Sequence, residues 1–492
     1  MAKSQNVTSA IDTSTEKGPQ QQPITARANA ITPWNFAVYL PLLIPIALFF
    51  VSLSNPPTID WDSGMGFVVL RGMLERGSFN IFMGLDHADF SPDFLYLWTH
   101  PADFPRDFLY LWTPGQYIVP GALIWLGSNY GLALSLTTLI ATLTGVIGWA
   151  QVARGFAVTP FVLIAFVSGL VSFRYATFAF RNYHGGEILL FAVAPWALYV
   201  LQRAVEKPPL ICFAISLLSA ALLFFAKETG LLCFGANVLA ISLLYVAREA
   251  RLSSSIIAMW AASLTGALLY LLFWPARDLG VGSARWLDIW FPVAGTAFAG
   301  FSGLDLLKSL LMHSSEMIAF DPYVAADKSN YVLGPVGLLF IILIWFRIRG
   351  TRYRAMAILL LSIAAIYTAA LIVIYYFTHT LFDRAAPFFE ERHLRYSGII
   401  VFLLFLVAID QSGRSLAKSC ALLVVGAFAA YGLMSFTSNT LEPGEGNDYD
   451  RFITSVMNDL QQRFRQLDHR LVRSAVEDVV GRDKSGHDGG RQ

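Results

Sequence analysis

The chain has 492 residues, of which 55% are hydrophobic and only 14% are charged, and its formal net charge is +1. A soluble domain carries about 25% charged residues, so this composition excludes an ordinary soluble domain. No basic patch with interleaved aromatic residues points to a nucleic-acid partner. Apolar runs of about 18 to 22 residues recur along the chain, and each is long enough to cross a ~30 Å hydrocarbon core. The sequence therefore predicts an all-α polytopic membrane protein.

Residues 1–33 are rich in Ser, Thr, Gln and Pro. Such a composition is typical of a disordered segment, which we expect to lie in the cytoplasm. The apolar run that follows, 36–54, ends without a small-residue cleavage site. We therefore expect a retained first helix rather than a signal peptide.

About eleven membrane helices are predicted in a transmembrane domain over 34–437. Placing the loops rich in Lys and Arg in the cytoplasm puts the Arg-rich loop 347–354 inside. This orientation requires that the short run 116–126, which contains a proline, does not span; we expect a juxtamembrane or re-entrant segment there. The predicted spans are 36–54, 131–152, 159–179, 187–204, 210–226, 229–247, 255–274, 331–348, 355–377, 396–411 and 417–437.

Several long segments fall outside the membrane in this orientation. The first outer loop covers 55–130, and a second large loop covers 275–330. The segment 378–395 and the tail 438–492 are also placed outside, and apolar residues at helical spacing after 450 predict that the tail is partly helical. Residues 88–99 recur almost unchanged at 102–113. This repeat is either a local duplication that lengthened the loop or a doubled aromatic platform for a sugar or lipid.

Two carboxylates, Asp60 and Asp62, come directly after the first predicted span. One of them is a candidate to take a proton from an acceptor hydroxyl or to hold that hydroxyl in place. An apolar interface would raise the pKa of such a carboxylate toward that of a useful base. The alternative is structural, since Asp62 precedes a helix-like run at 65–76 and Asp is a good N-cap.

Candidate cations for an anionic ligand fall in three other segments. Arg174 and Arg181 lie at the outer end of the third span, followed by His184 and Glu187 at the start of the fourth. Guanidinium groups suit phosphate geometry, whereas snorkelling toward the interface is the structural alternative.

The other two cationic segments are a tight turn and a late outer flank. Lys227 lies in the turn FFAKETG at 224–230. It is a candidate to contact a phosphate, and the alternative is a simple ion pair between Lys and Glu. Arg392 and Arg395 lie just before the tenth span, facing an anionic headgroup or forming an ordinary charged flank.

The sequence contains no P-loop, no HExxH motif and no Cys/His spacing typical of a metal site. We therefore expect any chemistry to draw on an activated, lipid-borne donor. No metal ligands are predicted, and a divalent cation is left as an open alternative.

Four segments, taken in order, resemble the GT-C membrane glycosyltransferases. They are an acidic pair followed by a short helix (59–80), WTPGQY at 112–117, LFFAKETG at 223–230, and the Arg-Tyr pair at 395–396. The order and spacing are similar over about residues 36–410, to the protein O-mannosyltransferases and the lipid A aminoarabinose transferases in particular. Thr113, Gly115 and Ala226 depart from the family's usual residues.

The resemblance implies a polyprenyl-phosphate-sugar donor, an active site at the extracytoplasmic face and inverting transfer to a lipid, glycan or protein acceptor. The sequence shows no organelle-retention signal, so we expect a bacterial inner (plasma) membrane. It implies that Asp60 or Asp62 is the catalytic residue, and that Lys227, with Arg392 or Arg395, contacts the donor phosphate. Arg174 and Arg181 join this phosphate set on the charge argument above. The candidate substrate-binding residues are Trp61, Trp112, Tyr117, His184, Glu187 and Tyr396.

Two alternatives stay open. A transporter or flippase of lipid-linked glycans would show inverted repeats and broken helices at mid-membrane, and no similarity between the halves of the chain is evident. A polysaccharide polymerase or ligase would share the large outer loops but would not need an acidic pair after the first helix.

Overall fold

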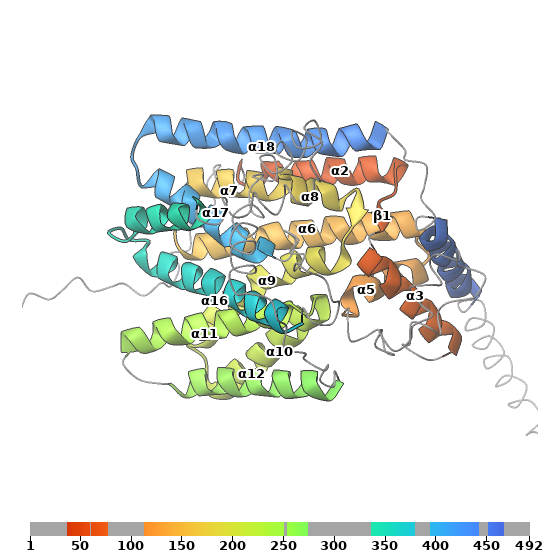
Figure 1. Ribbon diagram of the computed structural model, residues 1–492, viewed down its shortest axis with the longest axis horizontal. Coiled ribbons are helices and arrows are strands. Elements are labelled where there is room, and N and C mark those ends of the chain that lie inside the picture. Colours follow the sequence, from red (N-terminus) through yellow and green to blue (C-terminus); the bar gives the residue numbers. More distant parts are fainter. Residues whose placement is uncertain are drawn as a thin grey trace, which may run out of the picture.

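The computed structural model describes residues 37–59, 61–76, 113–249, 253–273, 336–378, 394–441 and 451–466. These residues form a bundle of helices that run side by side, with shorter elements at one end (Figure 1). The helices of the bundle are α2 (Leu43–Ser54, after the short helix η1, Leu40–Leu42), α6 (Tyr130–Gly155), α7 (Pro160–Ser172), α8 (Arg174–Ala179), α9 (Gly185–Ala204), α10 (Pro209–Ala226), α11 (Gly230–Glu249), α12 (Ser254–Phe273), a helix over 336–348, α16 (Arg354–Thr378), α17 (Arg395–Asp410) and α18 (Ser415–Leu441).

Six of the described helices are long and apolar enough to cross a membrane. They are α6, α9, α10, α11, the first part of α16 and most of α18. The architecture therefore agrees with the prediction of an all-α membrane protein. Helices cover all eleven predicted spans, but several are shorter, so the number of spans stays a prediction.

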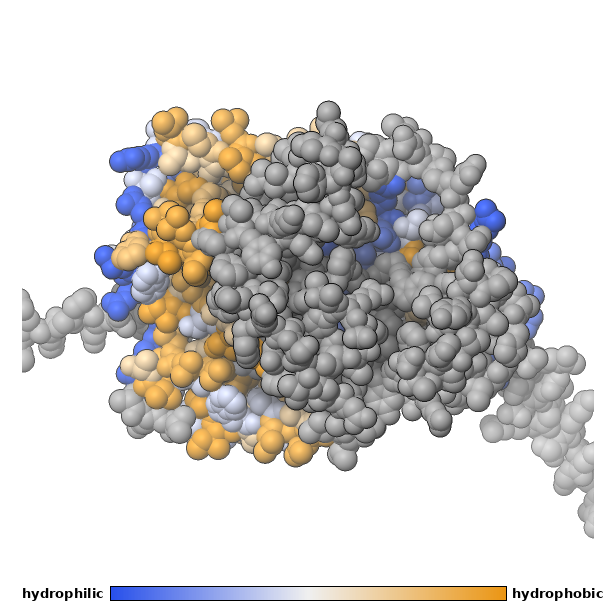
Figure 2. Space-filling view, viewed as in Figure 1, coloured by the Kyte–Doolittle hydropathy of each residue, from blue (hydrophilic) through white to orange (hydrophobic). Residues whose placement is uncertain are grey.

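Close helix packing depends on small residues, as is common in membrane bundles. A Cβ atom at Gly145 of α6 would come within 2.5 Å of the Phe191 ring of α9, and one at Gly148 within 2.8 Å of Pro195. The outward faces remain apolar, with Leu210, Leu264, Leu343 and Leu423 each more than half exposed. Figure 2 shows hydrophobic residues as an orange band toward the left of the described surface.

The third predicted span, 159–179, is not one helix. It starts where the Thr159 side chain accepts a hydrogen bond from the backbone of Val162, with Pro160 at the first helical position. It then breaks at Phe173, whose extended backbone (ψ 152°) separates α7 from α8. The expectation of a continuous helix there was wrong: hydropathy favours one span, although the polar residues Ser172 and Arg174 flank the break.

Shorter elements gather at the end of the bundle opposite the α6–α7 loop. They are α3 (Trp61–Arg76), α5 (Gly115–Trp125), the strands β1 (Thr58–Ile59) and β2 (Asn182–Tyr183), and a helix over 451–466. With 11 residues, α5 is shorter than the ~20 residues that a crossing helix needs. Figure 1 shows the 451–466 helix (blue, at the right) beside α3.

Candidate functional site

A two-residue parallel strand pair joins the first outer loop to the segment between α8 and α9. Thr58 pairs with Asn182 and Ile59 pairs with Tyr183. The Thr58 amide also donates to the Arg181 carbonyl at 2.8 Å. In the sequence Asp60 follows Ile59 and His184 follows Tyr183, so two predicted site segments enter the same region. Asp60 itself lies outside the described residues.

Helix α3 carries the rest of the acidic segment. The helix begins at Trp61, which places Asp62 in its first turn. The alternative of Asp62 as the N-cap of a helix at 65–76 was therefore wrong, since the helix starts earlier. An acidic residue in the first turn is favoured by the helix dipole. One residue further, the Ser63 hydroxyl accepts a hydrogen bond from the Gly185 amide at 3.0 Å, which fixes α3 against the start of α9.

The start of α5 fits against the same two helices. The buried Tyr183 hydroxyl donates to the Gln116 carbonyl at 2.7 Å. A Cβ atom at Gly185 would lie 2.6 Å from Gln116, and one at Gly66 would lie 2.5 Å from the ring of Tyr117. Glycine is required at both positions because a larger residue would separate α5 from its neighbours. Tyr117, a predicted substrate-binding residue, is fully buried here.

The centre of the site is an ion pair between Lys227 and Glu187. Glu187 lies in the first turn of α9, and Lys227 follows the last residue of α10 with an extended backbone (φ −162°). Both side chains are buried. The neighbouring acid in the sequence is Glu228, but this ion pair joins Lys227 to a residue 40 positions away. Two predicted site residues from separate helices thus meet.

Backbone packing holds this ion pair beside α5. Atoms of the Gln116 amide and of the Lys227 side chain flank Gly186, at 3.4 Å and 3.5 Å from the place a Cβ would take. In the turn itself, a Cβ at Gly230 would lie 2.1 Å from the Leu223 carbonyl oxygen. Glycine at 230 therefore allows a close approach that a larger residue would prevent, whereas the distances at Gly186 are ordinary van der Waals contacts.

Three buried hydroxyl groups, at the start of α5 and in the turn after Lys227, lack hydrogen-bond partners among the described residues. They belong to Thr113, Tyr117 and Thr229. Burial also raises the pKa of the Tyr117 hydroxyl above its ordinary value, so the group remains a donor. Buried polar groups without partners are rare and costly, and they mark a place for a polar ligand or water.

Arg395 and Tyr396 enter from the first turn of α17. The Arg395 guanidinium lies over the ring of Tyr175, 5.4 Å from its centroid. The Tyr175 ring in turn contacts Phe191, one turn from Glu187 on α9. The Tyr396 hydroxyl donates to the Asn237 side chain at 2.8 Å. Tyr396 therefore holds α17 against α11, a structural role beside the predicted substrate contact.

Arg174, Arg181 and His184 lie along α8 and its connection to α9. The Arg174 guanidinium lies 5.7 Å from the Phe178 ring centroid, and that ring lies 5.7 Å from the imidazole of His184. Burial lowers the pKa of Arg181. Arg181 and His184 flank β2, the strand that pairs with β1, and Arg174 begins α8, so cationic and aromatic groups lie near that strand in the chain.

In addition to Asp60, four candidate residues have side chains that the structure does not describe. Trp112 and Arg392 lie outside the described residues, while Trp61 and Asp62 are described as backbone of α3 alone. Sequence reasoning missed Ser63, Gln116, Thr113 and Thr229 as site residues. Their only signal was their place next to residues that were singled out. Within the described ranges, no group of three or more His, Cys, Asp or Glu side chains is arranged to hold a metal ion.

No protein-family model matches the chain, and no curated protein matches it. The resemblance to GT-C enzymes therefore rests on the four sequence segments alone.

Proposed function

We propose that this protein is a membrane glycosyltransferase that moves a sugar from a polyprenyl-phosphate donor to an acceptor at the extracytoplasmic face, with inversion of the anomeric carbon. The observation that supports this most directly is the buried Glu187–Lys227 pair beside the β1–β2 pairing. At this end of the bundle, cationic groups lie in the same region as the backbone that leads to Asp60 and Asp62.

The proposed reaction is an in-line displacement. The acceptor oxygen forms a bond to the anomeric carbon, and the bond from that carbon to the phosphate oxygen breaks. The phosphate leaves with the electron pair, and the acceptor proton passes to the carboxylate of Asp60 or Asp62. No oxidant or external energy source is needed.

Lys227 is the cation proposed to stabilise the leaving phosphate. A fixed positive charge at the place where negative charge develops acts strongly in a site that excludes water. Glu187 would position the ammonium and balance its charge before the donor binds. Arg395 lies on a third helix and is the second candidate for the phosphate, while the unpartnered hydroxyls of Thr113 and Thr229 are candidates for hydrogen bonds to the donor.

One observation favours the runner-up, a transporter or flippase of a lipid-linked glycan. The break at Phe173 separates α7 from α8 within a predicted span, and Arg174 lies next to it. Discontinuous helices with a charged residue at the break are a feature of transporter sites.

Sugar transfer from a panel of radiolabelled polyprenyl-phosphate sugars, with purified protein in lipid vesicles, separates these functions. A transferase releases polyprenyl phosphate and labels an acceptor, and the Asp60→Asn or Asp62→Asn variant loses this turnover. A flippase moves the intact donor across the vesicle membrane without releasing phosphate.

A further inference from the structure

A second cationic region lies at the other end of the bundle. The loop 347–354 joins the 336–348 helix to α16 and contains Arg347, Arg349, Arg352 and Arg354, all of them exposed. In Figure 1 this loop is at the left end, whereas α3 and α5 are at the right. The proposed transferase site does not use it.

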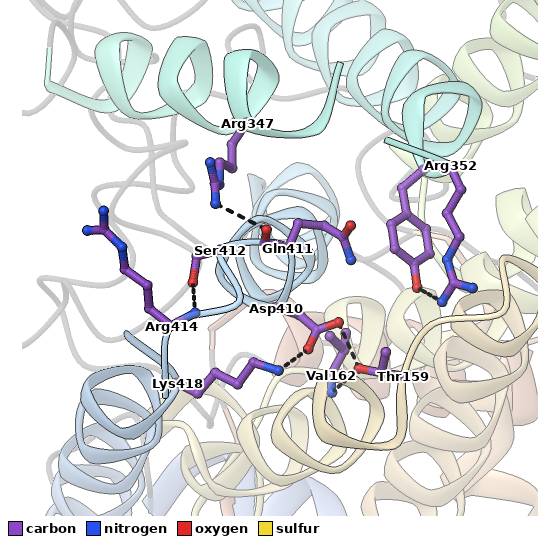
Figure 3. Close-up of polar contacts among 10 residues, drawn as sticks. Thr159, Val162, Arg347, Arg352, Asp410, Gln411, Ser412, Arg414 and Lys418 are labelled. Atoms are coloured by element: carbon purple, nitrogen blue, oxygen red, sulfur yellow. Dashed lines mark hydrogen bonds and ion pairs between the residues drawn. The ribbon is translucent and has the colours of Figure 1, made fainter. Parts of the chain in front are cut away.

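The loop is fixed to its neighbours by hydrogen bonds (Figure 3). Arg347 donates to the carbonyl of Gln411 at 3.1 Å, which ties the loop to the α17–α18 connection. Arg352 donates to the Tyr353 hydroxyl at 2.6 Å. That hydroxyl donates to the Ala157 carbonyl at 3.2 Å in the α6–α7 connection. Three connections are thus held together in one rigid surface.

The three connections 155–159, 347–354 and 411–414 contain no acidic residue. Asp410 is the acid that borders these connections, and it is buried. Its carboxylate accepts hydrogen bonds from Lys418 at 2.7 Å and from Thr159 at 3.1 Å, so its charge is already neutralised. We define the cationic patch as the four loop arginines together with the exposed Arg414.

The cationic patch begins where the exposed apolar faces of two helices end. On the 336–348 helix, Leu343 and Phe346 are 58% and 54% exposed, and on α18 Leu416 and Leu423 are each 73% exposed. The Arg349 guanidinium lies 4.4 Å from the Phe346 ring centroid, directly at this boundary. Figure 2 likewise shows hydrophilic residues at the left edge of the orange band. The arginines therefore lie at the depth of lipid headgroups.

We infer that the cationic patch is a binding surface for the headgroups of anionic phospholipids. Arginine pairs with phosphate through two parallel hydrogen bonds, and the neighbouring apolar faces would lie along the acyl chains of the same lipid. A soluble phosphate ester would make only the first of these contacts. An anionic lipid makes both the phosphate contact and the apolar contact. Each basic residue near an anionic lipid surface strengthens binding to that surface about fivefold, equivalent to ~1 kcal/mol.

The test is native mass spectrometry of lipid adducts on the purified full-length protein, titrated with dioleoyl phosphatidylglycerol or dioleoyl phosphatidylcholine. The test variant is Arg349→Gln/Arg354→Gln, because the hydrogen bonds that hold the loop come from Arg347 and Arg352 and are left intact. The control variant is Arg203→Gln/Arg248→Gln, which removes two exposed arginines from the ends of α9 and α11.

We expect phosphatidylglycerol to bind in preference to phosphatidylcholine, and its affinity to fall about 25-fold in the test variant and no more than a few-fold in the control. Equal binding of the two lipids would overturn the inference, as would an equal loss in both variants. Competition by glycerol 3-phosphate at the same concentration as the lipid would also overturn it, because the site would then be one for a soluble phosphate ester.

Discussion

The Lys227 side chain, at the end of α10, forms an ion pair with Glu187, in the first turn of α9, and the two residues are only 6% and 9% exposed. Two charges withdrawn from water lose hydration energy that a single ion pair rarely restores in full. Such a pair adds little net stability compared with an apolar pair, but removing one partner leaves the other charge buried alone. The pair therefore points to a functional reason for its presence.

The single variants Lys227→Gln and Glu187→Gln should each destabilise the protein by about 3–5 kcal/mol. The double variant Glu187→Gln/Lys227→Met should recover most of that loss, because no unpaired charge remains. Unfolding in denaturant, followed by tryptophan fluorescence, measures the difference. A double variant that is as unstable as the worse single variant would show that packing, and not charge, governs the effect.

Replacing Tyr117 by Phe should stabilise the free protein. Its buried hydroxyl has no partner among the described residues, and an unsatisfied buried polar group costs about 1–3 kcal/mol. The matched control is Tyr183→Phe, which removes the hydroxyl that donates to the Gln116 carbonyl and should destabilise. Opposite shifts in melting temperature are expected, and shifts of the same sign would contradict the assignment.

The same Tyr117 substitution should leave the pH dependence of stability unchanged between pH 6 and 9. Burial raises the pKa of this hydroxyl. The folded state therefore holds the proton more tightly than the unfolded state, whose pKa is about 10. The hydroxyl is therefore protonated in both states below that pKa. Its effect on the free energy of unfolding changes only as the pH rises above that value, where the preference for the protonated form begins to cost stability. Melting temperatures of wild type and Tyr117→Phe across this range should differ by a constant amount, and a difference that changes below pH 9 would contradict it.

Gly230 should not tolerate alanine, because the added Cβ would lie 2.1 Å from the Leu223 carbonyl oxygen. We expect Gly230→Ala to lower stability by about 1–3 kcal/mol through the displaced turn. Gly235, on the same helix, has open space at its Cβ position and serves as the control. There alanine should be neutral or stabilising by up to ~1 kcal/mol. Thermal unfolding of both variants compares them, and equal tolerance would show that the turn adapts.

The 451–466 helix should hold α3 in place. The Arg463 guanidinium lies 2.7 Å from the carboxylate of Glu75 on α3 and 2.8 Å from that of Asp459. On the same helix, Val456 and Leu460 are fully buried. The charge reversal Arg463→Glu should increase amide hydrogen exchange over 61–76, and the swap Glu75→Arg/Arg463→Glu should restore slow exchange. The control Arg465→Glu changes an exposed position on the same helix. If the swap exchanges as fast as the single reversal, the ion pair does not carry the contact.

Much of the bundle followed from the sequence because apolar runs of sufficient length specify helices in lipid. Helices cover each predicted span, and Lys227, Glu187 and Tyr117 were singled out by charge, aromatic character and position. The break at Phe173 was not predicted, since the hydropathy of a whole segment does not locate an interruption within it. The β1–β2 pairing also could not be predicted, because two residues are too few to give an alternating pattern.

The partner of Lys227 shows the same limit at the site. Sequence proximity favours Glu228, whereas the fold brings Glu187, from 40 positions earlier, into an ion pair with Lys227. Pairings of this kind depend on which helices pack together, and composition and spacing do not contain that information. The residues of a candidate site can be named from sequence, whereas their contacts come from the tertiary structure.

The most direct test of the proposed function is the initial rate of polyprenyl-phosphate release from a lipid-linked sugar donor by the protein in lipid vesicles. Wild type is compared with Asp62→Asn, Lys227→Gln and, as a control for loss of one positive charge, the exposed Lys207→Gln. We predict release by wild type and by Lys207→Gln, and a loss of at least a hundredfold in the other two, as is typical when a group that stabilises a transition state is removed. No release by folded wild-type protein with any donor in the panel, or full activity in Lys227→Gln, would contradict the assignment.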